Sequence, residues 1–232
     1  MGTDDVPRVS SGVKGLDNLI EGGFPKGSVT LISGGAGCGK TIFCNQYLWD
    51  GLQEGEKVRY ISLEEPVDDI MGDAEVFGWE FRDYEEDGQF KIDYIKPSSG
   101  SRGFIDKINE MASEEGVSRL VIDSISVMLG AYGGTQAKKR DNLYDLLRNI
   151  KRAGPTTLLT SEIPENDEKA LSRFGVSEFV ADGVVVLYYT GVGEGTFRNL
   201  EVRKMRRTDH TPGTHPFQIT DQGINLTSEA GF

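Results

Sequence analysis

The sequence has few residues suited to covalent cross-links or metal sites, with two cysteines and two histidines among 232 residues. Cys38 and Cys44 lie close together in the chain, so we expect no disulfide framework and a reducing, cytoplasmic location. His210 and His215 have no cysteine and no paired acids near them in the sequence. We therefore predict no zinc site.

Long apolar runs are also missing. No stretch approaches the roughly 20 apolar residues that a membrane-spanning helix needs, and residues 1–7 do not resemble a signal peptide. We therefore expect no membrane association. With 37% hydrophobic and 27% charged residues, the chain has the composition of one globular α/β domain over residues 1–232, frayed over residues 1–11.

Basic residues are scarce relative to acidic ones. The chain has 25 Lys and Arg against 37 Asp and Glu, a formal net charge of −12. Because such a charge repels a polyanion, nucleic acid is not the default partner.

Residues 34–41 match the phosphate-loop pattern G-x-x-x-x-G-K-[ST]. In such a loop the backbone N–H groups surround phosphate oxygens, the lysine, here Lys40, reaches the β and γ phosphates, and the hydroxyl of Thr41 ligates Mg²⁺. The pattern requires a strand before it and a helix after it, and residues 28–33 and 42–52 have those characters. The alternative, a glycine-rich turn without a ligand, is disfavoured because motif and context agree.

Strand and helix patterns alternate along most of the chain. Further strands are predicted at residues 58–63, 90–95, 119–123 and 156–161, and helices at 68–77, 103–115 and 136–152. After residue 181 the pattern changes to a hairpin of residues 184–189 with 197–205, and a short strand at 216–219. This order predicts a mainly parallel sheet with helices on both faces and antiparallel C-terminal strands.

Two strands end in carboxylates suited to ATP hydrolysis. Asp123 ends an apolar strand in the Walker B manner and would hold Mg²⁺; the alternative is an ordinary strand-end acid. Glu64 and Glu65 follow another strand, and one of them would orient the attacking water, unless both only begin the next helix. Residues 159–162 give a weaker polar signal at a third strand end.

A basic cluster at residues 203–207 stands out in this acidic chain. Lys204 and Arg206 alternate, so in a strand they share one face and would present two cations to one anion. The alternative is a solvated strand end.

Taken together, these segments resemble the KaiC branch of the RecA superfamily of ATPases. The resemblance covers nearly the whole chain and includes residues 15–27, the Glu64-Glu65 pair, residues 77–79 and the tail at 216–224. The tail is the more diagnostic part, since phosphate loops are common. The clock protein of this family has two such domains in tandem, so the chain is more similar to stand-alone KaiC-like proteins common in archaea.

The resemblance implies a RecA-type core that assembles as a ring, commonly a hexamer, with ATP bound between subunits. It assigns the phosphates to Gly35, Ala36, Gly37, Cys38, Gly39, Lys40, Thr41 and Ile42. It makes Glu64 and Glu65 the catalytic carboxylates, beside Lys40. It brings a second group to the ATP of the adjacent subunit: Lys204, Met205, Arg206, Thr208, His210, Thr220 and Asp221.

The sequence therefore predicts a slowly hydrolysing ATPase ring that regulates a protein partner. The main alternative is a RecA or RadA paralogue that binds single-stranded DNA through residues 128–140 and 163–175. The first of these segments carries Tyr132, Lys138, Lys139 and Arg140, but the second is acidic. A GTPase is disfavoured because no Asn-Lys-x-Asp sequence is present.

Overall fold

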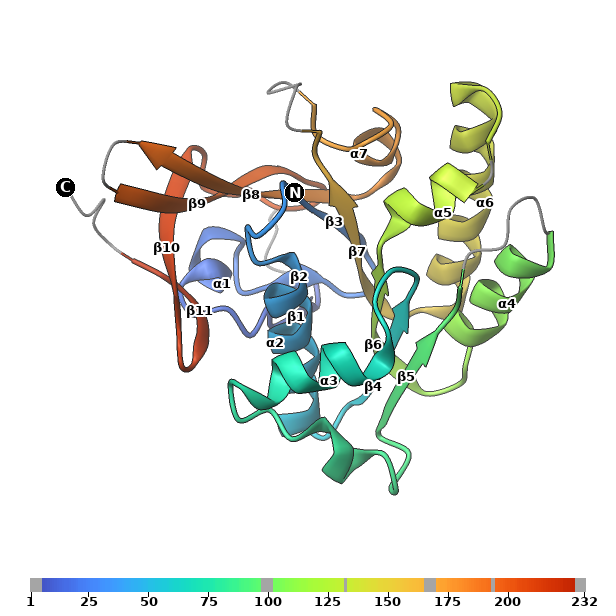
Figure 1. Cartoon of the computed structure of the whole chain (residues 1–232), viewed down its shortest axis with the longest axis horizontal. Coiled ribbons are helices and arrows are strands. Elements are labelled where there is room, and N and C mark those ends of the chain that lie inside the picture. Colours follow the sequence, from blue (N-terminus) through green and yellow to red (C-terminus); the bar gives the residue numbers. More distant parts are fainter. Residues whose placement is uncertain (1–5, 97–101, 132, 165–169, 193–194, 228–232) are drawn as a thin grey trace.

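A nine-stranded sheet organises the chain in the computed structural model, which describes residues 6–96, 102–131, 133–164, 170–192 and 195–227 (Figure 1). The strands lie in the order β11-β10-β9-β8-β3-β7-β6-β4-β5. Their bounds are β3 (Val29–Gly34), β4 (Lys57–Ser62), β5 (Phe90–Tyr94), β6 (Val117–Asp123), β7 (Thr156–Glu162), β8 (Gly183–Val192), β9 (Gly195–Met205), β10 (Thr214–Thr220) and β11 (Gly223–Leu226). Strands β8 to β5 in this order are parallel, and β9, β10 and β11 are antiparallel to their neighbours, so the predicted fold class is confirmed.

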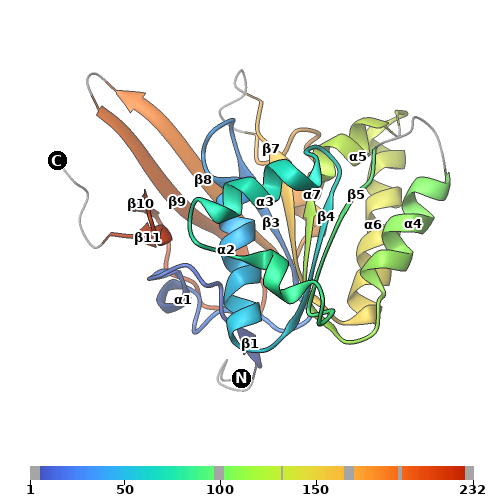
Figure 2. The same ribbon diagram turned by 60° about the horizontal axis from the view of Figure 1, so that its bottom comes forward.

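Helices cover both faces of the parallel part, as Figure 2 shows. Alternate residues of the central strands enter two hydrophobic clusters; in β3, for example, Ile32 joins one cluster and Leu31 the other. One cluster packs against α1 (Leu16–Leu19), α2 (Lys40–Gln53), α3 (Val67–Glu75) and the 3-10 helix η2 (Phe81–Tyr84). The other packs against α4 (Arg102–Ala112), α5 (Ile125–Ala131), α6 (Gln136–Ala153) and α7 (Ser177–Val180).

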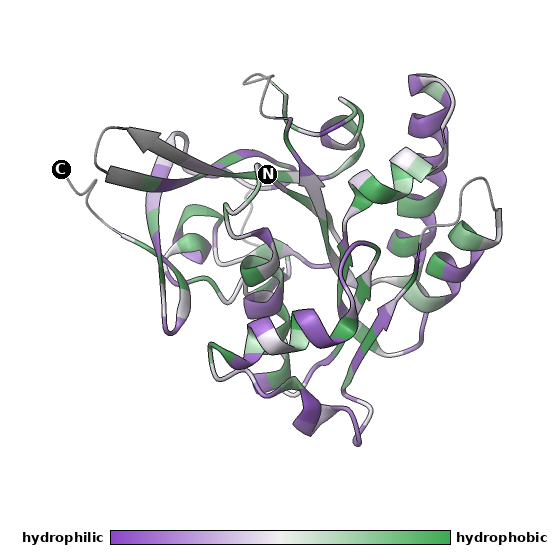
Figure 3. Ribbon diagram, in the orientation of Figure 1, coloured by the Kyte–Doolittle hydropathy of each residue, from purple (hydrophilic) through white to green (hydrophobic). Residues whose placement is uncertain are grey.

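The helices α4 and α6 are amphipathic, with hydrophobic and hydrophilic residues alternating along them (Figure 3). In α6, Leu143, Leu146, Leu147 and Ile150 recur at helical spacing and are buried. Thr135 caps the start of this helix by accepting a hydrogen bond from the backbone N–H of Lys138, and Gly154 ends it in the left-handed conformation. Within the described residues, no helix combines the length and apolarity required to span a bilayer.

Residues 6–11, part of the segment for which the sequence predicts fraying, contact the rest of the chain. Strand β1 (Arg8–Val9) pairs with β2 (Phe24–Pro25), and the Arg8 guanidinium donates to the Thr208 hydroxyl at 2.6 Å and to the Glu21 carboxylate at 2.7 Å. The sequence pattern missed this pairing because a two-residue strand has no readable periodicity. Helices α5 and α7 and strand β11 were also unpredicted, for the same reason of length.

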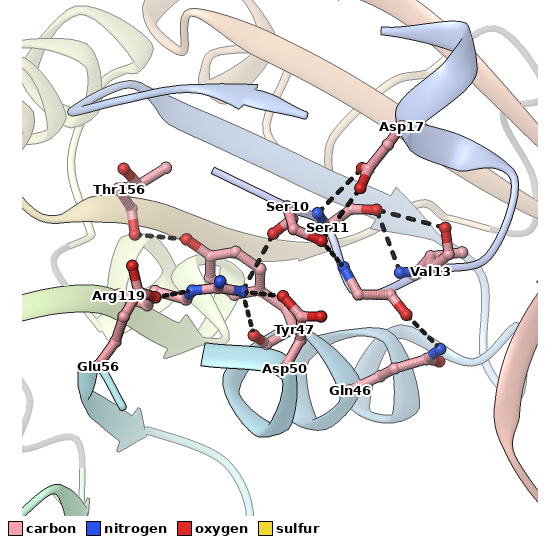
Figure 4. Close-up of polar contacts among 11 residues, drawn as sticks. Ser10, Ser11, Val13, Asp17, Gln46, Tyr47, Asp50, Glu56, Arg119 and Thr156 are labelled. Carbon is pink, nitrogen blue, oxygen red and sulfur yellow. Dashed lines mark hydrogen bonds and ion pairs between the residues drawn. The ribbon is translucent and has the colours of Figure 1, made fainter. Parts of the chain in front are cut away.

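A buried cation fixes α2 against β6 at the end of the sheet remote from the phosphate loop (Figure 4). Arg119 is 2% exposed; it donates to the backbone carbonyls of Ser10 and Tyr47 at 3.0 and 2.8 Å and to Asp50 at 2.8 Å, and pairs with Glu56. Its guanidinium also lies over the ring of Tyr47, 4.9 Å from the centroid. The N-terminal segment, α2 and β6 are therefore held together by one side chain.

Candidate functional site

The phosphate-loop motif connects β3 to α2 at the carboxyl edge of the parallel strands. Gly34 has no room for a side chain, because a Cβ there would lie 2.3 Å from Cys38 Sγ and 2.6 Å from the carbonyl oxygen of Leu187. Gly39 has φ +102° and precedes the first residue of α2 without a side-chain cap. The first N–H groups of α2 are thus left for an anion.

Two side chains of the loop have different environments. The Lys40 ammonium folds back over the loop and donates to the carbonyls of Gly34 and Gly35 at 3.1 and 2.9 Å. Cys38 is fully buried, and burial raises the pKa of its thiol, although the charge of Lys40 opposes that shift. Cys38 therefore offers a ligand its backbone rather than a reactive thiolate.

A pocket of about 370 Å³ opens over the loop and brings together half of the predicted site residues. It is lined by Ala36, Gly37, Gly39, Lys40, Thr41, Ile42, Glu64, Glu65, Asp73, Asp123 and Glu162. The loop, both predicted glutamates and the Walker B aspartate therefore face one cavity. Asp73, from α3, was not predicted, since nothing in a helical pattern marks a residue that borders a pocket.

Asp123 is oriented by hydroxyl groups from the two strands beside β6. Tyr60 donates to one carboxylate oxygen at 2.7 Å, and Thr160 donates to the other. Burial, followed by the negative charge of Asp123, raises the pKa of the Tyr60 phenol well above its usual range. Tyr60 therefore stays a proton donor, and the carboxylate is held in one direction.

Glu64 and Glu65 lie on the turn that follows β4. The hydroxyl of Ser62 ties this turn, since it accepts from the backbone N–H of Glu65 at 3.1 Å and donates to the carbonyl of Glu65 at 2.5 Å. Partial burial raises the pKa of both glutamates, and the nearby carboxylate of Asp123 adds to that rise. Neither carboxylate is used up in an ion pair among the described residues.

The chemistry of this pocket suits a divalent cation shared with a polyanion. Five carboxylates line it against a single cation, Lys40. Nevertheless, no group of three or more acids, histidines or cysteines in the described ranges is arranged to hold a metal by itself. Such an oxygen-rich, incomplete donor set fits Mg²⁺, which takes few protein ligands and completes its shell with phosphate oxygens and water.

The basic cluster lies at the opposite edge of the sheet. Lys204 pairs with Val184 and Met205 with Gly183, and Gly183 in turn pairs with Thr30 at the start of β3. The phosphate loop begins at Gly34, four residues after Thr30. At about 3.3 Å per residue, the loop lies about 13 Å from Thr30 along the strand direction. Lys204 and Arg206 are therefore remote from the pocket of their own chain.

The residues of this cluster differ in availability. The Arg206 side chain is 57% exposed, with its guanidinium 3.5 Å from Asp182. The Lys204 ammonium is turned inward and donates to the carbonyls of Glu178 and Ala181 at 3.1 and 2.6 Å. The side chain of Met205 is buried in the core, so only its backbone is open to contact.

The remaining candidates for neighbour contact occupy two other places. Thr208 is bonded to Arg8 beside the N-terminal strand, and His210 follows it in the same loop. Thr220 and Asp221 form the β10–β11 turn, which packs against α2 of the same chain; Ile219 Cδ1 would lie 3.4 Å from a Cβ on Gly39. The predicted second group is thus spread over three locations rather than one surface.

Comparison with known proteins gives a consistent family assignment. The family model for the KaiC ATPase matches residues 9–231. The circadian clock oscillator protein KaiC of Synechococcus elongatus is 35% identical over 95% of this chain, and the chain spans 44% of that protein. A UPF0273 protein of Thermotoga maritima is also 35% identical, with 97% of this chain and 98% of that protein covered.

A solved structure has the same fold. A KaiC-like protein from the hyperthermophilic archaeon Pyrococcus horikoshii superposes with a TM-score of 0.85 at 37% sequence identity. The alignment covers 96% of this chain and 99% of that one.

Proposed function

Because the chain belongs to the KaiC family of ATPases, we propose that it binds ATP with Mg²⁺ and hydrolyses it slowly in a homo-oligomeric ring, commonly a hexamer in this family. Its nucleotide state would regulate a protein partner. The observation that carries the proposal is the division of the site between two edges of one sheet. The phosphate loop and carboxylates lie at one edge, and the cations Lys204 and Arg206 lie at the other.

Within one subunit, the loop and the acids have separate roles. Backbone N–H groups of residues 35–42 and the Lys40 ammonium bind the phosphates. To do so, Lys40 gives up its hydrogen bonds to the Gly34 and Gly35 carbonyls in favour of phosphate oxygens. Thr41 and Asp123 would hold Mg²⁺, which neutralises phosphate charge when bound. Glu64 or Glu65 orients water and accepts its proton, and the raised pKa of both carboxyls brings them closer to the task of a base.

A second subunit completes the site. Arg206, exposed and remote from its own pocket, reaches the γ-phosphate bound in the adjacent copy, in the manner of an arginine finger. Lys204 contacts the same phosphate after it breaks its hydrogen bonds to the carbonyls of Glu178 and Ala181 at the end of α7. Hydrolysis is slow in a separated chain because the transition-state charge then lacks these cations.

Thr220 and Asp221 are assigned to the nucleotide of the adjacent subunit, as the resemblance implies. Gln46 of α2 binds the backbone N–H and carbonyl of Ile224 at 2.7 and 3.1 Å, which fixes the β10–β11 turn against α2. Neither Thr220 nor Asp221 lines the pocket of its own chain, which is consistent with that assignment.

Two measurements test the proposal. Lys40→Ala should abolish ATP binding and hydrolysis, whereas the control Lys26→Ala, an exposed lysine outside the pocket, should retain both. The mass of the protein in solution should rise to that of a ring when ATP and Mg²⁺ are added. Unchanged ATP binding in Lys40→Ala, or a monomer at all ATP concentrations, would contradict the proposal.

Binding of single-stranded DNA is the second candidate function. Of the predicted DNA-contacting residues, Lys138 and Arg140 are exposed, but Lys139 is buried with its ammonium 3.7 Å from the ring centroid of Phe174. Tyr132 and residues 165–169 lie outside the described residues. Since one of three cations is already engaged, the structure favours this candidate less, and a salt-dependent titration with single-stranded DNA tests it.

A further inference from the structure

A second cavity, of about 340 Å³, lies between α6, α7 and the end of β9. We call it the basic cleft; it is lined by Tyr144, Leu147, Arg148, Lys151, Arg152, Val180 and Arg206. Four of these seven residues are cations in a chain with a net charge of −12. Arg206 belongs to the predicted finger, but none of the α6 residues was expected to contact a nucleotide.

The carboxylate of Asp182 organises this cleft from beneath. Asp182 is 9% exposed; one oxygen accepts from the backbone N–H of Val29 at 3.0 Å, and the other accepts from the Lys151 ammonium at 2.7 Å. The Arg206 guanidinium lies 3.5 Å from that second oxygen. The backbone N–H of Arg206 also donates to the Asp182 carbonyl at 3.0 Å. Asp182 therefore holds Lys151 and Arg206 side by side.

The cleft retains an excess of positive charge. Asp182 is shared by two cations, and Asp145 pairs with Arg148 at 3.1 Å on the exposed surface. The pKa of the Tyr144 phenol is lowered, first by its hydrogen bond from Arg140, with the charges of Arg206 and Lys204 adding to the effect. The residues lining the cleft thus carry more positive than negative charge.

An exposed aromatic residue lines the cleft, and a second one is adjacent to it in the sequence. Tyr144, in the lining, is 45% exposed, and Phe179, next to the lining residue Val180, is 61% exposed, whereas most large hydrophobic side chains of the described residues are buried. Exposed aromatic side chains beside arginines are typical of protein interfaces. The complementary surface exists on the same chain, since the nucleotide pocket carries five carboxylates and one cation.

We propose that the basic cleft docks on the anionic edge of the nucleotide pocket of a second copy, with Lys151 as a further cation of the shared site and Asp182 as a positioning residue. This inference rests on the proposed function, because it assumes that Arg206 acts in the adjacent subunit. It adds that Arg206 does not act alone. Lys151 reaches the same pocket from α6, and the Asp182 carboxylate holds Lys151 and Arg206 in fixed positions relative to each other.

The primary experiment removes Lys151. At saturating ATP, Lys151→Ala should lower turnover about tenfold, the loss expected for one charge-assisted contact, while Lys151→Arg should restore most of it. Lys107→Ala, on an exposed lysine of α4 outside the cleft, is the matched control and should behave as wild type. Unchanged turnover in Lys151→Ala would overturn the inference.

Mixing subunits separates a role in the adjacent site from a folding defect. Lys40→Ala copies keep an intact cleft, and Lys151→Ala copies keep an intact nucleotide pocket. Mixed in equal amounts with ATP, the two variants should hydrolyse more than the sum of their separate activities. A mixture that only adds the two activities would show that Lys151 does not act across the interface.

Asp182→Asn provides a second variant that can still accept from the Val29 N–H. It should lower turnover and be complemented by Lys40→Ala copies in the same way, with ATP affinity unchanged. Loss of turnover without complementation would assign Asp182 a role in folding only.

If Arg206→Ala leaves turnover unchanged, the proposed function itself fails. If only the Lys151 and Asp182 variants leave turnover unchanged, the inference alone fails. Single-stranded DNA binding that Lys151→Ala abolishes would replace the second copy with nucleic acid as the occupant.

Discussion

The two edges of the central sheet differ in charge and in completeness. The carboxyl edge carries the phosphate loop and five pocket carboxylates; Lys40 is the one cation among the residues that line the pocket, and Arg173 pairs with Glu162 beside it. The amino edge carries Arg206, Lys151 and Lys204, together with the buried Arg119. Each edge has what the other lacks for phosphoryl transfer, where phosphate charge must be both bound and neutralised. This difference supports the proposal that each chain contributes to two nucleotide sites, one with each of two neighbouring copies.

The largest expected effect lies at the carboxyl edge. Glu64→Gln and Glu65→Gln each keep the size of the side chain but remove its ability to accept a proton. The variant of the residue that activates water should lose roughly 10²- to 10³-fold in turnover, while ATP binding persists. Turnover at saturating ATP and a nucleotide-binding titration would measure both quantities. If neither variant slows hydrolysis, the acidic half-site has another base.

At the amino edge we expect a loss of similar size in free energy, but in the stability of the fold and not in activity. Arg119→Met would leave Asp50 and Glu56 without their buried partner, so the free energy of unfolding should fall by about 3 kcal/mol. The matched control is Arg82→Met, whose ion pairs are exposed and should be worth below about 0.5 kcal/mol. Urea denaturation of both variants measures the difference. Equal losses would mean that burial does not distinguish these arginines.

The two edges also differ in how far the sequence predicted them. The motif at residues 34–41, Asp123 and the Glu64-Glu65 pair were identified because each follows a strand, and parallel strands bring their carboxyl ends to one edge. Lys151 and Asp182 have no such signal: one is an ordinary position on a helix, and the other precedes a strand. They meet because α6 packs against α7, which ends just before Asp182, a long-range contact that periodicity does not encode.

The same limit explains the altered positions in the predicted second group. The resemblance assigned this group to one neighbouring site, and strand alternation predicted only that Lys204 and Arg206 share a face; Met205, between them, is buried. The turn at Thr220 and Asp221 returns to α2 because Gln46 binds the backbone of Ile224. Strand ends can therefore be placed together from the sequence, whereas positions that depend on how loops and helices pack cannot.

A smaller effect should separate two cations of the amino edge. Arg206→Ala should lower turnover at least about tenfold without changing the thermal midpoint, because the side chain is exposed and its only ion pair in the described residues is at 3.5 Å. Lys204→Ala should lower both quantities, since its ammonium also bonds the carbonyls at the end of α7. Turnover and thermal unfolding of both variants provide the comparison. A stable Lys204→Ala protein would show that these carbonyl bonds contribute nothing to the fold.

The smallest expected effect concerns pH and the cost of gathering acids at the carboxyl edge. The pKa of Glu64 is raised by burial and then by Glu162 and Asp123, so the folded state holds a proton on this carboxyl more tightly than the unfolded chain does. This contribution to stability is present below the ordinary carboxyl pKa and is lost as the pH rises through the raised value. At neutral pH the ionised Glu64 therefore destabilises the fold slightly. Glu64→Gln should raise the thermal midpoint at pH 7 and leave it nearly unchanged at pH 4, whereas Glu54→Gln, on an exposed residue outside the pocket, should shift neither. If the midpoint for Glu64→Gln is no higher than that of wild type at pH 7, the clustered acids do not destabilise the fold. The two edges would then differ in charge but not in their effect on stability.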